Sequence, residues 1–207
     1  DPSNLDRVRA VIDLKSKVLE RNQARLGEIL TDMLTRPDFT DLARLKTVIG
    51  QVKSSMENSI AGSGHSFAAR AAASGLTPAA QLREEWSGLS QLLLIRKAAE
   101  LDDRDVARLS EKFMQIARLL LTRQNVTAVV TAERHSHASM SGPLQSLLEA
   151  LPSAGSSEPS PLNKFIPRTS ATGWSYNVPV AYVTRVFRTL PFTDPGAAAL
   201  MVLAKLL

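Results

Sequence analysis

The apolar positions of residues 3–36 recur every seven residues, which predicts one long helix that begins after a Ser3 N-cap and ends at Pro37. These positions are Leu5, Ile12, Leu19, Leu26 and Met33. A second set, spaced by three and four residues over 42–60, predicts a second long helix. Because the connection is short, we expect the two helices to fold back on each other as an antiparallel hairpin.

Further helices are predicted over 65–74, 77–99 and from Asp102 or Asp103 to about Leu120. The break between the second and third helices falls at the triplet 62–64, Gly-Ser-Gly. Thr77 precedes Pro78, and this order is typical of an N-cap followed by the first helical residue.

The pattern changes from helical to strand-like near Asn125. Residues 126–131 and 178–188 are rich in β-branched residues and predict two strands, with helices over 141–151 and from 194 to the last residue. Residues 152–167 are rich in Ser, Pro and Gly and predict a linker. One strand and one helix cannot bury each other's apolar faces, so the last unit needs partners that this sequence does not contain. The expected fold class is α+β and predominantly helical.

Composition and charge narrow the function. Aromatic residues make up 5% of the chain, there is no cysteine, and the net charge is +5. Bases and acids alternate along the helical stretches instead of forming the basic cluster that nucleic acid requires, so we expect no nucleic-acid partner. No apolar run approaches the roughly 20 residues that span a bilayer, and no membrane partner is expected.

Few residues suggest chemistry. His135 and His137 would share one face of a strand, with Glu133 as the nearest third metal ligand, but a solvated polar turn is the favoured interpretation. His65 follows Gly64 at a helix start and is interpreted as structural. The sequon at Asn125 is interpreted as a chance occurrence inside a buried strand. The phosphate-binding loop pattern and G-x-S-x-G are both absent from the sequence, so no catalytic or metal-binding residue is predicted.

Two stretches resemble the presequence-protease and falcilysin branch of the pitrilysin/insulysin zinc metallopeptidases. The first is residues 58–92, and the second, NVPVAYVTRVFRTLPFTDPGAAALMVLAKLL, is residues 177–207. The residues that carry the signature of the first stretch are Asn58, Gly64, His65, Pro78, Trp86 and Gly88.

The resemblance implies a large enzyme of four related domains around a chamber, which degrades short unfolded peptides such as targeting presequences with one zinc ion. Its zinc motif, H-x-x-E-H, does not occur here, so no cofactor is expected in this segment. By the resemblance, residues 1–60 form the hairpin that links two halves, 61–151 belong to the third domain, 152–167 are a linker and 168–207 open the fourth domain. A helix of about 30 residues is about 45 Å long, which suits a hinge.

The partners implied are the other domains of the same protein and peptide substrates. The implied location is an organelle matrix, of mitochondrial or plastid type, or the bacterial cytoplasm. Two alternatives stay open: a helical protein-interaction module that docks a partner helix along the seam of Leu5 to Met33, and an inactive peptidase paralogue. A serine hydrolase is disfavoured because the sequence lacks G-x-S-x-G.

Overall fold

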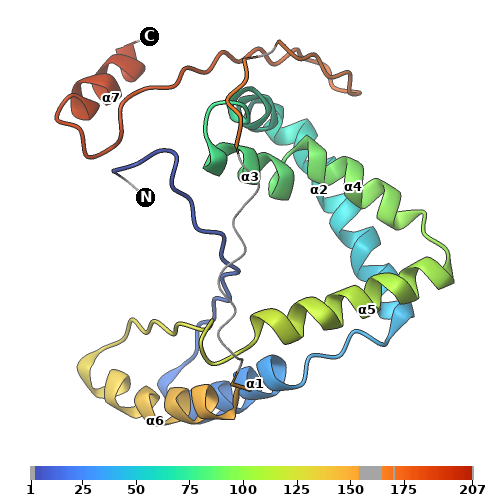
Figure 1. Ribbon diagram of the computed structural model, residues 1–207, viewed down its shortest axis with the longest axis vertical. Coiled ribbons are helices and arrows are strands. Elements are labelled where there is room, and N and C mark those ends of the chain that lie inside the picture. The colour runs from blue at the N-terminus through green and yellow to red at the C-terminus, as the bar shows by residue number, and fades with distance from the viewer. Residues whose placement is uncertain (1–2, 154–164, 170, 207) are drawn as a thin grey trace. The chain divides into compact units, whose positions relative to one another are not determined.

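The computed structural model describes residues 3–153, 165–169 and 171–206. The chain is predominantly helical, as expected (Figure 1). Its helices are α1 (Gln23–Thr35, after a 3₁₀ turn at Glu20–Asn22), α2 (Leu42–Ala73), α3 (Pro78–Ser87), α4 (Leu89–Ala99), α5 (Asp103–Leu120), α6 (Arg134–Ala150) and α7 (Ala197–Leu206). None of the described helices combines the length and apolar character needed to cross a membrane.

The prediction of strands is wrong for the described residues. Residues 126–131 and 178–188 both run as irregular backbone, and no ladder forms anywhere in the described part of the chain. A strand is stable only when a neighbour pairs with its N–H and C=O groups. High β-propensity in two isolated segments is therefore not enough to make a sheet.

The first half of the predicted long N-terminal helix is also wrong. Residues 7–19 are irregular, and the helix α1 begins only at Gln23. Ile12 is 83% exposed and Leu19 61% exposed, so the apolar seam is uncovered there. A helix in a protein draws most of its stability from burying such a face, and here only the second half does so. The antiparallel hairpin stays a prediction.

The remaining helix starts largely match the sequence pattern. The Thr77 hydroxyl accepts the Ala80 N–H at 3.1 Å, as an N-cap should, and the Asp102 carboxylate accepts the Asp105 N–H at 2.8 Å. The predicted helix over 77–99 is in fact two helices, because Gly88 ends α3 and begins α4. The predicted helix from Ser141 starts earlier, at Arg134.

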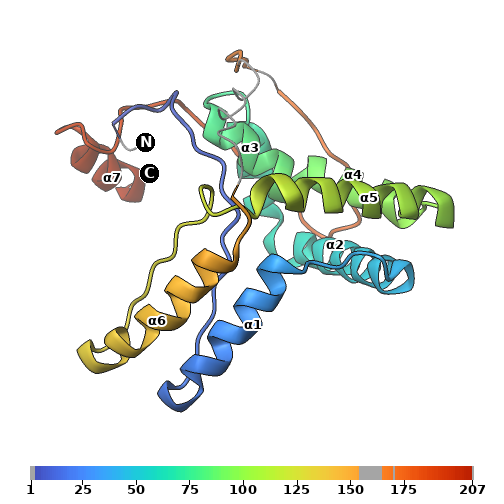
Figure 2. The ribbon, with the colours of Figure 1, turned by 60° about the horizontal axis from the view of Figure 1, so that its bottom comes forward.

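One compact unit is formed by residues 13–47 and 101–160. In it α1 and α6 run side by side in the same direction (Figure 2), because Gln23 pairs with Ser139 and Gly27 lies against Pro143. A β-carbon at Gly27 would meet the Pro143 ring, so glycine lets the two helices approach closely. Val106 on α5 is fully buried.

The other compact unit is formed by residues 1–12, 48–100 and 161–207. Its core consists of Ile60 and Phe67 on α2 and Leu92 on α4, all at most 5% exposed. Residues from the 171–178 segment pack against this core through Tyr176 and Val178. Most of the predicted linker, residues 154–164, lies outside the described residues.

The helix α7 is apolar on all sides and has no buried residue. Asp194 caps the turn before it by accepting the Gly196 N–H at 2.8 Å. Met201, Val202 and Leu206 are each more than half exposed. This agrees with the expectation that the last unit leaves apolar surface uncovered. A helix that is hydrophobic all round is normally buried.

Candidate functional site

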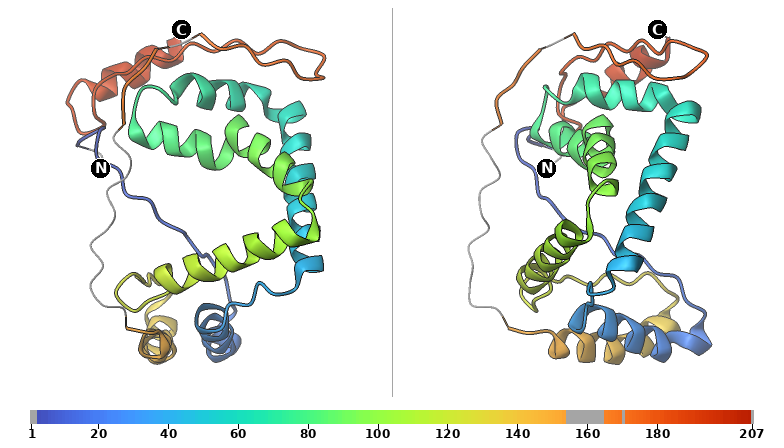
Figure 3. Two further views of the ribbon diagram at one scale, coloured as in Figure 1. Left: turned by 45° about the vertical axis from the view of Figure 1, so that its right-hand side comes forward. Right: turned by 90° about the vertical axis from the view of Figure 1, so that its right-hand side faces the viewer.

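The residues that carry the family signature gather around a bend in α2. The predicted break at 62–64 is confirmed as this bend: helical backbone continues on both sides, but Ser63 takes non-helical angles, φ −140° and ψ 30° (Figure 3). Glycines on both sides of Ser63 lower the helix propensity of the triplet by about 1 kcal/mol each relative to alanine. The sequence therefore places the bend at Ser63.

Gly64 is required by a close contact at the bend. A β-carbon built on Gly64 would fall inside the Tyr182 ring, whereas one on Gly62 would meet nothing within 4 Å. The Tyr182 hydroxyl donates to the Ala61 carbonyl at 3.4 Å. The exposed ring of His65 lies 6.2 Å from the Tyr182 ring, centroid to centroid.

A buried carboxylate joins α3 to α4 at the second part of the signature. Glu84 is only 7% exposed, and its Oε1 accepts the Ser90 N–H at 3.0 Å in the first turn of α4. A negative group is favourable at a helix N-terminus. Gly88 is buried between the two helices, and a β-carbon there would meet the Glu84 backbone and carboxylate. Glycine is therefore the residue that fits this junction.

The other signature residues are placed without forming a reactive group. Pro78 is the first residue of α3, as predicted. Asn58 is exposed on α2, and Trp86 on α3 is 54% exposed. The structure thus brings Gly64 and His65 together at the bend and Gly88 into the α3–α4 junction, while Asn58 and Trp86 face solvent.

Two side-chain networks in this unit were missed by the sequence analysis. In the first, Arg96 on α4 donates from Nε to Glu57 Oε1 on α2 at 2.7 Å, and its guanidinium lies 5.7 Å from the centroid of the Tyr176 ring. The hydrogen bond to Glu57 raises the pKa of Arg96, so the guanidinium stays charged. These partners are far apart in sequence, and no local pattern signals them.

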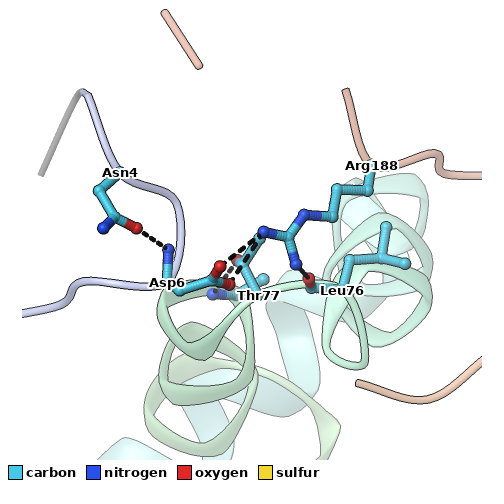
Figure 4. Close-up of polar contacts among 6 residues, drawn as sticks. Asn4, Asp6, Leu76, Thr77 and Arg188 are labelled. Atoms are coloured by element: carbon cyan, nitrogen blue, oxygen red, sulfur yellow. Dashed lines mark hydrogen bonds and ion pairs between the residues drawn. The ribbon is translucent and has the colours of Figure 1, made fainter. Parts of the chain in front are cut away.

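In the second network, Arg188 joins three segments (Figure 4). Its Nη2 donates to both carboxylate oxygens of Asp6 at 2.9 Å, and its Nη1 donates to the Leu76 carbonyl at 3.4 Å. The bidentate geometry is the strong form of an arginine–carboxylate pair. Arg188 therefore holds the N-terminal segment against the turn before α3.

The histidine pair is not placed as the strand prediction required. His135 and His137 lie in the first turn of α6, and residues two apart on a helix point to different sides. His135 Nδ1 is instead 2.6 Å from Glu20 Oε1. Among the described residues, no three histidine, aspartate or glutamate side chains are grouped so as to hold a metal ion. A zinc ion does not fit the residues present.

One shallow hollow of about 530 Å³ lies between α6 and the segment after α5. Its lining includes Arg123 and Glu149, and its serine, Ser141, has no histidine beside it in the lining. Asn125, at the neighbouring sequon, is exposed and not buried as expected, and its amide donates to the Leu119 carbonyl at 3.0 Å. These groups do not form a nucleophile–base pair.

Comparison with known proteins gives the architecture a family. Residues 1–97 match the family model for the peptidase-associated region of subfamily C of the M16 peptidases. The chain is 26% identical to the mitochondrial presequence protease of Xenopus laevis, 31% identical to that of Aspergillus fumigatus and 24% identical to that of Mus musculus, and each alignment covers 100% of this chain. It covers 23%, 20% and 23% of those relatives, so it spans less than a quarter of their length. The chain belongs to the presequence-protease branch of the pitrilysin peptidases.

Proposed function

We propose that this chain is a non-catalytic segment of a zinc metalloendopeptidase that degrades short unfolded peptides such as targeting presequences. The observation that carries the proposal is the alignment of the whole chain with mitochondrial presequence proteases. The same relatives support an organelle matrix as its location. Zinc chemistry would come from protein outside these residues, because the described side chains do not group as metal ligands.

Within that enzyme the segment would act as a hinge and as part of the chamber wall. Three features support this role: the long α2, its defined bend at Ser63, and the uncovered apolar surface of α7. The surface of α7 fits a segment that packs against further domains of the same protein. An independent interaction module is less well supported, because residues 7–19 of its docking seam do not form a helix.

The catalytic part of the proposal is tested by assaying the 207-residue chain with added zinc against a fluorogenic presequence peptide. We expect no cleavage above a chelator-treated sample, whereas the complete gene product should cleave the peptide in a chelator-sensitive way. Turnover by the chain alone would refute a non-catalytic role. An inactive complete product would favour the inactive-paralogue alternative.

The hinge and wall role is tested in the complete gene product with Ser54→Pro, because proline in the interior of α2 removes a helix hydrogen bond and costs about 3 kcal/mol. Ser54 is exposed, so Ser54→Ala is a matched control. We expect Ser54→Pro to lower kcat/KM for the peptide while bound zinc and helical circular dichroism are retained. Unchanged turnover would contradict the hinge and wall role.

A further inference from the structure

The only two tyrosines of the chain contact the turn of α2 that leads into the bend. Tyr176 donates its hydroxyl proton to the Glu57 carbonyl, and Tyr182 donates to the Ala61 carbonyl, each at 3.4 Å. The two acceptors are four residues apart and therefore lie one turn apart on the same face of α2. Residues 171–188 thus follow the helix toward Ser63.

The ring of Tyr182 occupies the space beside Gly64 that a larger residue would fill. The ring of Tyr176 packs against the apolar core and under the Arg96 guanidinium. Further along, Arg188 binds Asp6 and the Leu76 carbonyl. Side chains spaced six residues apart therefore hold this segment at three points.

Between these anchors the segment is held weakly. Its backbone forms no strand ladder within the described residues, and both tyrosine hydrogen bonds are long for an O–H···O bond. Val183, next to the second anchor, is 94% exposed, and Phe187 is 67% exposed. A segment with few buried contacts opens at low free-energy cost.

The bend in α2 also depends on compensation from outside the helix. Non-helical angles at Ser63 interrupt the regular pattern in which each N–H bonds the carbonyl four residues earlier. A straight helix through the triplet 62–64 would restore that pattern. The tyrosine ring and hydroxyls are present only in the bent arrangement, so two states of similar free energy are available to α2.

We propose that residues 171–188 act as a releasable strap, docked through Tyr176 and Tyr182, that holds α2 bent, and that α2 straightens when the strap leaves. The strap is a conformational device of this unit. It does not depend on the peptidase role proposed above.

The test measures the distance across the bend in the full chain. Because the sequence has no cysteine, Ser54→Cys and Ala72→Cys provide unique sites for two spin labels on α2. A straight helix places positions 18 residues apart at roughly 27 Å, and a bent one places them closer. Pulsed electron resonance then compares the labelled parent with Tyr182→Ala and with Val183→Ala as the matched control.

We expect one short distance in the labelled parent and in Val183→Ala, and a second, longer distance in Tyr182→Ala. The double variant Tyr176→Phe and Tyr182→Phe keeps both rings and loses both hydroxyls. It should increase the long-distance population about fivefold, the effect of losing two weak hydrogen bonds.

A distance distribution in Tyr182→Ala that matches the labelled parent, with helical circular dichroism retained, overturns the strap. An equal shift in Val183→Ala also overturns it, because that side chain is not an anchor. If Tyr182→Ala loses its helical signal, the double phenylalanine variant decides, and an unchanged distribution in that variant rejects the proposal.

Discussion

The two glycines that flank Ser63 should respond in opposite directions to the same substitution. Both have helical backbone angles, so alanine gains about 0.8–1.0 kcal/mol of helix propensity at either position. At Gly62 the new methyl group meets nothing within 4 Å, and Gly62→Ala should stabilise the chain by about 1 kcal/mol. At Gly64 the methyl group overlaps the Tyr182 ring, and overpacking of this kind costs about 1–3 kcal/mol.

For Gly64→Ala the propensity gain offsets part of that cost, which leaves a net loss of about 0–2 kcal/mol. The two variants should therefore differ by about 1–3 kcal/mol in free energy of unfolding, with Gly62→Ala the more stable. Urea unfolding followed by circular dichroism measures this difference. Equal free energies for the two variants would show that Tyr182 does not occupy the space beside Gly64.

Two further predictions concern carboxylates that accept backbone N–H groups. Glu84→Ala should lower the free energy of unfolding by about 1–2 kcal/mol because it removes the buried acceptor for Ser90 N–H; Glu84→Gln keeps an acceptor oxygen and should lose less, and exposed Glu85→Ala should have little effect in the same urea assay. The Thr40 N–H and hydroxyl lower the pKa of Asp38 from its ordinary 3.8, so this carboxylate stabilises the fold above pH 3.8 and loses that contribution as pH falls through its lower folded value. Asp38→Asn should therefore be less stable than the parent at neutral pH and approach it in acid, and a stability difference that does not shrink on acidification would contradict this.

Local signals in the sequence predicted the caps and breaks well. Thr77 with Pro78, Asp102, and the triplet around Ser63 each act within one or two turns of their own position, and the structure places each where its pattern indicates. The break at Gly88 was missed because the signal that marks it is the buried contact with Glu84, which is visible only in three dimensions.

The longer-range features could not be read from periodicity. The contacts of Tyr182 with Gly64 and of Arg188 with Asp6 join residues more than 100 positions apart, and nothing in the local pattern of either partner identifies the other. The failed strands have the same origin. The β-propensity of residues 126–131 and 178–188 was recognised correctly, but propensity does not supply a pairing partner.

The bare surface of α7 has a practical consequence for anyone who handles this chain. Ten consecutive helical residues with a single charge, Lys205, present a greasy cylinder to water, and exposed patches of this kind attract chaperones and promote clumping. Production of the isolated 207 residues in a cell would thus be limited by quality control, and low protein concentration, mild detergent or a fused solubility partner should be chosen from the outset.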